Sequence, residues 1–305
     1  MTTAATPADI EALAPIVKPE VSAALLASDP YLDEDLAAWH AASADRPRLR
    51  LLGDVQVTAG GQQPDAKTAI ATEAIAYLAL HSTGVTGDRF AADFWPRNNY
   101  TIKDSNPKNL LSIVRSWLGT DPLTDSPCLP YAKSAGRASG SALYRLSGLL
   151  VDWDLFCRLR SRGEARGAEG LTDLVAAMDL VSGVPLSALR GGGGAWLSDD
   201  AVADVHVMTA AIVDVANIVV TRALDEGDLL LARRVAEKSA AIESGSDRPL
   251  LDLAAVCEAE GRTAELGATV RRIVTQHGAV VEEDVPADTY NVMLRRGWVG
   301  LTQAS

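Results

Sequence analysis

The sequence has few of the residues that usually carry chemistry. It contains three cysteines and four histidines among 305 residues. The cysteines are Cys128, Cys157 and Cys257, an odd number at wide spacings. This predicts neither a disulfide framework nor a CxxC metal site and fits a reducing compartment. The histidines show no HExxH or HxH spacing, so we expect no metal, because a zinc site needs three or four ligands at recognisable spacings.

Signals for nucleotide binding, nucleophilic catalysis and membrane insertion are also missing. The glycines at 191–194 are not followed by Lys-Ser/Thr, which predicts a flexible loop rather than a phosphate cradle. No histidine adjoins a cysteine to activate it. The most apolar segment, 201–220, is interrupted by polar residues and predicts a core helix, and the N-terminus lacks signal-peptide features. We therefore expect a cytoplasmic protein that is not an enzyme and has no cofactor.

The charge is distributed unevenly along the chain. The net charge is −12, and the 48% of hydrophobic residues predicts a globular chain long enough for two domains and an extension. Residues 1–45 carry one Lys and eight acids, residues 46–150 carry twelve Lys/Arg and eight acids, and residues 151–305 carry fifteen Lys/Arg and twenty-four acids. Only the middle region is basic, at +4, and the local field is what attracts a phosphate backbone.

The N-terminal region, residues 1–45, is rich in Ala, Pro and Asp. Short helices are predicted around 19–27 and 33–40, separated by a turn at Ser28-Asp29-Pro30. Leu36 and Trp39 lie three residues apart and are placed to pack on the next domain. The alternative is a loosely ordered acidic arm.

Residues 46–150 follow the order of elements of a winged helix-turn-helix. Alternating apolar residues predict strands at 48–51 and 55–57, closed by Ala59-Gly60-Gly61. Helices are predicted at 64–81, 87–94 and 107–119, with Thr86 capping the second. We expect 120–130 to be a loop. A strand that Tyr131 begins would then pair with a strand at 143–146, and the basic loop between them would form a wing for backbone phosphates.

The third predicted helix carries the candidate recognition surface. Asn106, Pro107 and Gly119 suit its N-cap, first turn and end. Its predicted buried stripe is Leu110, Leu111, Val114, Trp117 and Leu118. Its opposite, exposed side is Lys108, Asn109, Ser112, Arg115 and Ser116. Asn and Arg can bond base edges and Lys contacts phosphate. An ordinary amphipathic surface helix is the alternative, and the position after two helices and before a hairpin favours DNA.

Residues 151–305 are predicted to be helical throughout. The expected helices are 154–162, 171–180, 199–226, 228–244, 249–260, 264–277 and 287–295. Short connections predict antiparallel helical hairpins. Gly227-Asp228 and Gly261-Arg262 are 34 residues apart, the period of a tetratricopeptide (TPR) unit. Arrays of this kind usually bind protein segments or mediate oligomers.

Several short segments also occur in a characteristic order. They are Leu51-Leu52-Gly53-Asp54-Val55-Gln56-Val57, Ala76-Tyr77-Leu78-Ala79-Leu80-His81, Asp88-Arg89-Phe90, Phe94-Trp95-Pro96, Ser112–Gly119 and Tyr144-Arg145-Leu146. In this order they resemble the winged-helix half of actinobacterial SARP-type regulators. Val151-Asp152-Trp153-Asp154-Leu155-Phe156 is similar to the beginning of that family's bacterial transcriptional activation domain (BTAD). The resemblance is closest to the version at the C-terminal end of large LysM-containing proteins.

The resemblance implies a mainly α protein with a small β component. An OmpR-like winged helix-turn-helix in 46–150 would follow an acidic arm in 1–45 and precede an all-α, TPR-like helical-hairpin domain in 151–305. It further implies that the third helix reads the major groove and that the wing touches the backbone. By position these roles fall on Lys108, Asn109, Ser112, Arg115 and Ser116 in the helix and on Lys133 and Arg137 in the wing. The sequence departs from the family in keeping a single arginine, Arg115, where several are usual.

Two functions are therefore expected. The first is a DNA-binding transcriptional regulator, whose winged helix binds duplex DNA while the helical domain dimerises or contacts another protein. The alternative is a protein–protein interaction module with a degenerate winged helix that does not bind DNA, possibly part of a larger LysM-type protein. Under the first function, replacing Lys108 and Arg115 should weaken duplex binding with little loss of fold, since both side chains are predicted to be exposed.

Overall fold

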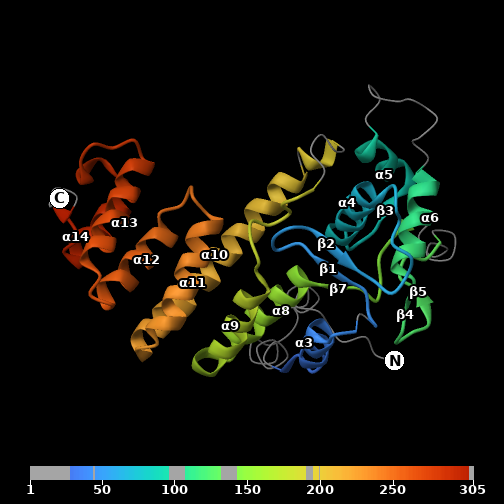
Figure 1. Ribbon diagram of the computed structural model, residues 1–305, viewed down its shortest axis with the longest axis horizontal. Coiled ribbons are helices and arrows are strands. Elements are labelled where there is room, and N and C mark those ends of the chain that lie inside the picture. The colour runs from blue at the N-terminus through green and yellow to red at the C-terminus, as the bar shows by residue number, and fades with distance from the viewer. Residues whose placement is uncertain are drawn as a thin grey trace, which may run out of the picture. The chain divides into compact units, whose positions relative to one another are not determined.

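The computed structural model describes residues 28–43, 45–95, 107–131, 143–189, 195–198 and 200–301 (Figure 1). Contacts between residues divide the chain into two compact units. Unit 1 comprises Met1–Gly170 and Asp179–Met208, and unit 2 comprises Leu171–Met178 and Thr209–Ser305. The boundary expected at residue 150 does not coincide with this division, because the helix that follows it belongs to unit 1.

Unit 1 contains a three-stranded sheet in the order β2–β1–β7. The strands are β1 (Arg48–Arg50), β2 (Gln56–Thr58) and β7 (Leu150–Val151). In β1, Leu49 lies opposite Val57 of antiparallel β2 and opposite Val151 of parallel β7. Leu49 is fully buried. The alternation of apolar residues thus predicts β1 and β2 to within one residue.

Asp152 links this sheet to α8 (Asp152–Ala165). Its fully buried carboxylate accepts hydrogen bonds from the backbone N–H groups of Leu51, at 2.7 Å, and Leu52, at 3.1 Å. Burial raises the pKa of Asp152 to about 6, and the two backbone hydrogen bonds offset this effect only in part. Asp152 therefore positions the end of β1 against the start of α8 at an electrostatic cost.

The acidic N-terminal segment is held on α8 by ion pairs. Arg158 donates to both carboxylate oxygens of Asp29 at 2.9 Å and to Asp35 at 2.6 Å. Trp39, in α3 (Leu32–His40), is buried, as its spacing from Leu36 predicts. Residues 29–40 are therefore an ordered part of unit 1, and the loosely ordered arm is wrong for them. The helix predicted at 19–27 lies outside the described residues.

Three helices follow the first two strands. They are α4 (Thr68–Leu80), α5 (Gly87–Phe94) and α6 (Pro107–Leu118) (Figure 1). Thr86 caps α5 as predicted, accepting from the Arg89 N–H. The prediction that the first of these helices begins at Pro64 is wrong. The Thr68 hydroxyl donates to the Pro64 carbonyl, so that 64–67 forms a bend before α4.

An aromatic cluster packs α4 against α5. The Tyr77 ring meets Phe90 and Phe94 edge-on, with centroids 5.8 and 5.3 Å away. Trp196, in the short helix η3 (Ala195–Leu197), approaches Tyr77 to 5.2 Å. Its indole N–H donates to the buried Glu73 of α4 at 3.1 Å. Phe90 and Phe94 face inward as their i, i+4 spacing predicts.

The strands after α6 differ from the predicted wing. β6 (Leu143–Tyr144) pairs with β3 (Val85–Thr86), which lies between α4 and α5. The strand predicted to begin at Tyr131 is wrong, because Tyr131 is in no strand. The expected loop at 120–130 contains a hairpin of β4 (Thr120–Asp121) and β5 (Ser126–Pro127). The Asp121 carboxylate holds its turn, accepting from the Leu123 N–H and the Thr124 hydroxyl at 3.0 Å.

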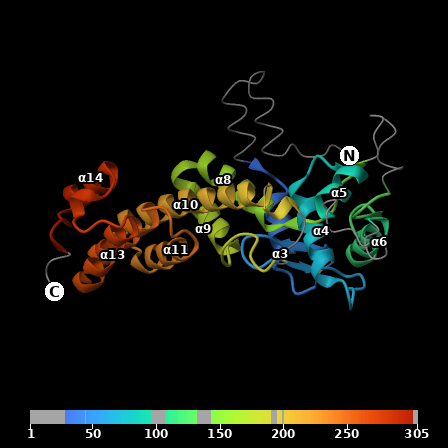
Figure 2. The same cartoon turned by 90° about the horizontal axis from the view of Figure 1, so that it is seen from above.

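The remaining helices match the predicted ones to within two residues at each end. They are α9 (Leu171–Leu180), α10 (Asp200–Glu226), α11 (Leu229–Ile242), α12 (Arg248–Ala259), α13 (Thr263–Gln276) and α14 (Ala287–Arg296). In unit 2, α11 packs on α12 and α12 on α13. Figure 1 shows the short connections between these helices, and Figure 2 shows α11, α13 and α14 from above. α10 is long and apolar enough to cross a membrane, with a mean hydropathy of 1.7, yet 56% of that window is buried. This burial favours the predicted core helix.

The turns after α10 and α12 repeat one hydrogen-bond pattern 34 residues apart. At the first, the Asp228 N–H donates to Ala223 and the Leu229 N–H donates to Gly227. At the second, the Arg262 N–H donates to Cys257 and the Thr263 N–H donates to Gly261. The two turns therefore have equivalent hydrogen bonds, which supports the 34-residue repeat from which TPR-like hairpins are predicted.

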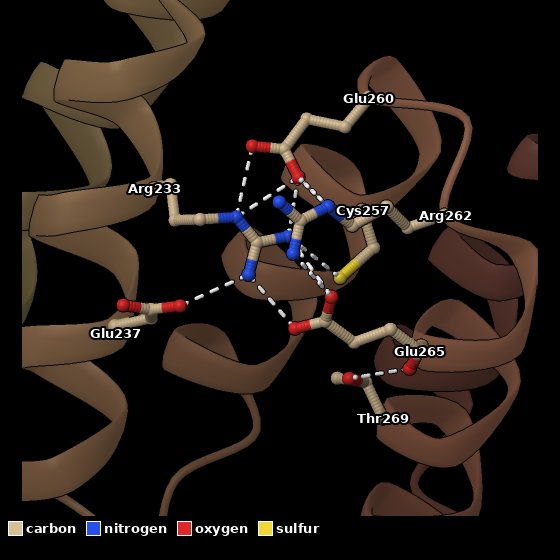
Figure 3. A network of polar contacts seen from close by, with 7 residues as sticks. All are labelled: Arg233, Glu237, Cys257, Glu260, Arg262, Glu265 and Thr269. Atoms are coloured by element: carbon tan, nitrogen blue, oxygen red, sulfur yellow. Dashed lines mark hydrogen bonds and ion pairs between the residues drawn. The ribbon is translucent and has the colours of Figure 1, made fainter.

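A single arginine joins α11 to α12 and α13. The Arg233 Nε donates to both oxygens of Glu260, at 2.8 and 2.9 Å, and Nη1 donates to Glu265 at 2.8 Å and Glu237 at 2.9 Å (Figure 3). Figure 3 shows the guanidinium lying between the carboxylates. These contacts lower the pKa of Glu260 and Glu265. The planar guanidinium suits such multiple contacts, which the point charge of a lysine cannot reproduce.

We predict that Arg233→Lys destabilises unit 2 by about 1–3 kcal/mol, because the replacement leaves Glu260 and Glu265 without their forked partner. Urea unfolding measures the loss. The control is Arg296→Lys, whose arginine forms a half-exposed pair with Glu258 at 3.2 Å, and which should change stability by less than about 0.5 kcal/mol. Equal effects of the two substitutions would contradict the role given to Arg233.

A second prediction concerns pH. The folded pKa of Asp152, about 6, lies above its ordinary value of 3.8. The stability it contributes is therefore fully present below about pH 4 and is lost as the pH rises through about 6, by about 3 kcal/mol. Urea unfolding at pH 4.5 and 7.5 should show most of this loss in the wild type. The loss should be smaller in Asp152→Asn, whose side chain does not titrate. Parallel pH profiles of the two proteins would refute the prediction.

Candidate nucleic-acid interface

The candidate recognition helix is α6, and its burial follows the predicted stripe. Leu110, Leu111, Val114, Trp117 and Leu118 are all buried, and α6 packs on α4 and α5. Gly119 ends it with a φ of +69°, a left-handed conformation that glycine adopts without strain. The expected N-cap, Asn106, lies outside the described residues.

The chain that follows β2 packs closely against the last turn of α6. A Cβ atom at Gly61 would lie 2.2 Å from the Ser116 carbonyl oxygen and 2.3 Å from that of Trp117. Only a glycine permits this approach of the chain after β2 to the helix end. The position of α6 therefore depends on the loop that follows β2 as well as on its own apolar stripe.

The outward side of α6 carries four of the predicted residues. Lys108, Asn109, Ser112 and Ser116 are exposed. Ser112 lies four residues after Lys108 and three after Asn109, and Ser116 lies four after Ser112, so the four residues share one side of the helix. This side offers one cation, one carboxamide and two hydroxyls, groups that can contact phosphate and base edges.

Arg115 is placed differently from the expectation. The prediction that its side chain is exposed is wrong, because it is half-buried. Its Nε donates to the Leu129 carbonyl at 2.7 Å, and its guanidinium carbon lies 3.9 Å from the centre of the Tyr131 ring. Arg115 thus holds the segment after β5 on α6. The sequence carries no local signal for this contact, since its partners lie 14 and 16 residues further on.

Two other basic residues of the region are paired with acids. Arg46 pairs with Asp35, and Arg89 pairs with Asp93 and Asp200 at 3.4 Å. Two of these acids, Asp35 and Asp200, come from outside the basic region of 46–150. The positive charge counted along the sequence is therefore partly neutralised in space. Lys133 and Arg137, the predicted wing residues, lie outside the described residues.

Two other kinds of chemistry, a bound metal ion and a reactive cysteine, have little support in the described part of the chain. No group of three or more His, Cys, Asp or Glu side chains is placed there to hold a metal ion. Cys128 and Cys257 are buried, and burial raises the pKa of the Cys128 thiol to about 11. A thiol with a raised pKa is a poor nucleophile. The outward side of α6 therefore remains the candidate site.

Comparisons with known proteins bear on the fold. No family model matches the sequence, and no curated protein does. Among solved structures, the chain is similar to EmbR of Mycobacterium tuberculosis in complex with a low-affinity phosphopeptide, with a TM-score of 0.57 and 18% identity. The match covers 82% of this chain and 64% of the EmbR chain. It supports the expected fold: mainly α, with an OmpR-like winged helix-turn-helix and a helical domain.

We predict that Arg115→Ala destabilises unit 1 by about 1–2 kcal/mol, because the Leu129 carbonyl loses its donor and the Tyr131 ring loses its cation. Thermal or urea unfolding followed by circular dichroism measures the loss. The control, Ser112→Ala, lies on the same helix and removes an exposed hydroxyl, so it should change stability by less than about 0.5 kcal/mol. A loss for Arg115→Ala no greater than that for Ser112→Ala would exclude this structural role.

Proposed function

We propose that this chain is a DNA-binding transcriptional regulator similar to the SARP-type proteins, in which α6 enters the major groove of duplex DNA. Lys108 contacts a phosphate, Asn109 and Ser112 meet base edges, and Ser116 contacts the backbone or a base. The helical domain dimerises or binds another protein. In this proposal the protein acts in the cytoplasm and has no enzymatic activity.

The observation that carries the proposal is the two-sided character of α6. One side is buried in unit 1, and the other presents Lys108, Asn109, Ser112 and Ser116 together. The helix follows α4 and α5, and β3 pairs with β6, an order typical of winged helices whose third helix reads DNA. Because its apolar side is buried in unit 1, α6 would hold its polar side in a fixed orientation toward the groove.

The likeness to EmbR supports this class of function at the level of the fold. The chain spans about 64% of the EmbR chain, so what EmbR binds through its remaining part does not transfer. With one exposed cation on the described part of α6, we expect modest affinity. Non-specific complexes of this kind have Kd values of roughly 1–100 µM at physiological salt.

The test is fluorescence anisotropy with a labelled duplex of about 30 base pairs in a salt titration. We predict that Lys108→Ala with Asn109→Ala weakens binding and makes the slope of log K against log salt less negative by about 1, since one phosphate contact is lost. The loss of the Asn109 side chain should cost about 1–3 kcal/mol more of binding free energy only on a cognate sequence, where its carboxamide contacts a base edge.

The matched control is Arg295→Ala. Arg295 is exposed on α14 in unit 2, and its replacement removes the same unit of charge from the chain. It should leave duplex affinity and the salt slope unchanged. Equal slopes for the wild type and the α6 double variant would overturn the recognition face, whereas an equal effect of Arg295→Ala would assign binding to the overall charge.

A second candidate function is a protein-interaction module whose winged helix does not bind DNA. The observation that favours it is the use of Arg115 inside unit 1, where its Nε donates to the Leu129 carbonyl. A wild-type chain without salt-sensitive affinity for any duplex would favour this function over the first.

A further inference from the structure

One segment of the N-terminal region, residues 29–43, contacts five arginines of unit 1. They are Arg46, Arg48, Arg50, Arg158 and Arg162. Arg48 and Arg50 flank the buried Leu49 in β1, so their side chains lie on the opposite face of the strand from the core. Arg158 and Arg162 are one turn apart on α8, which packs on β1. The junction of β1 and α8 is therefore rich in positive charge.

Three aspartates of this segment hold three of the arginines. The pairs are Arg158 with Asp29 at 2.9 Å and with Asp35 at 2.6 Å, Arg46 with Asp35, and Arg162 with Asp33 at 2.8 Å. Because Asp35 bridges Arg46 and Arg158, the arginine before β1 and those of α8 are close neighbours. Both oxygens of Asp29 accept from Arg158, which is the forked geometry by which arginine also binds phosphate.

The same segment also contacts the two arginines of β1. Arg48 donates to the Ser43 carbonyl, and the guanidinium carbon of Arg50 lies 5.8 Å from the centre of the Trp39 ring. Residues 29–43 thus supply a carboxylate, a carbonyl or an aromatic face to each of the five cations. One short stretch of chain therefore neutralises or covers a whole basic surface.

The attachment of α3 to this surface depends on few apolar contacts. α3 has nine residues and no side-chain hydrogen bond at its N-cap, and helices this short are marginal on their own. Its buried side chains are Leu32 and Trp39. Ion pairs taken out of water contribute little net stability, since desolvation offsets their attraction. Because the segment precedes β1, it can leave the arginines without breaking a strand pair of the three-stranded sheet.

We propose that residues 29–43 form an autoinhibitory cover, which competes with the phosphate backbone of duplex DNA for these five arginines. When a duplex displaces the cover, phosphates take the places of the three aspartate carboxylates. A strand and a helix that each carry arginines at regular intervals suit an extended chain of anions better than a single small anion. The surface contains no residue of α6, so the proposal does not depend on the function proposed for that helix.

The test uses the full chain with Lys108→Ala and Asn109→Ala, so that these side chains of α6 do not contribute. In this background we predict that Asp29→Asn, Asp33→Asn and Asp35→Asn together raise the affinity for the same labelled duplex about tenfold at roughly 50 mM salt. The slope of log K against log salt should become more negative by about 3, because three arginines gain phosphate partners. Fluorescence anisotropy measures both quantities, and circular dichroism verifies the fold.

The matched control combines Glu283→Gln, Asp284→Asn and Asp288→Asn, three exposed acids of unit 2 whose loss changes the net charge by the same amount. It should leave the affinity and the slope as they are in the background chain. Equal gains for the two triple variants would assign the effect to overall charge and overturn the proposal, as would no gain in a folded cover variant. A gain for phosphatidylserine vesicles without one for the duplex would assign the surface to a membrane and also overturn it.

Hydrogen exchange gives an independent measurement that does not require the cover variant to fold. It uses the full chain with the natural residues 29–43 and the two α6 substitutions. We predict that excess duplex at roughly 50 mM salt speeds amide exchange in α3, because displacement of the cover removes the contacts that protect it. Unchanged or slower exchange in α3 would refute the competition. An α6 that does not contact DNA would alter the earlier comparison of α6 variants but neither of these results.

Discussion

Unit 1 depends on the buried contact between the Asp152 carboxylate and the end of β1. The backbone N–H groups of Leu51 and Leu52 both donate to it, although they lie 101 and 100 positions before Asp152 in the sequence. The contact brings the first strand of the winged helix to the first turn of α8, where a carboxylate also interacts favourably with the helix dipole. Buried backbone donors must be satisfied, so this contact fixes where β1 ends.

The acids that lie outside the winged helix change its electrostatics. Along the sequence, 46–150 is a basic island, but in space Asp35 of α3 pairs with Arg46 and Asp200 of α10 pairs with Arg89. Asp29 and Asp35 in turn hold Arg158 of α8. The Asp35–Arg46 pair therefore both helps to order the N-terminal segment and withdraws positive charge that would otherwise attract phosphate. An arginine that is paired within the protein attracts phosphate less. Among the described residues, most arginines of 46–150 form such internal contacts.

Local signals in the sequence were enough to predict the helices and most of their ends. Thr86 caps α5, Gly119 ends α6, and the repeated Gly-Asp and Gly-Arg pairs mark equivalent turns in unit 2. Contacts over a long sequence distance were not predictable in this way. The burial of Arg115 depends on Leu129 and Tyr131, which lie 14 and 16 residues further on. In the candidate site, periodicity predicts which side of α6 faces outward. It does not predict which side chain on that side, here Arg115, instead contacts the rest of unit 1.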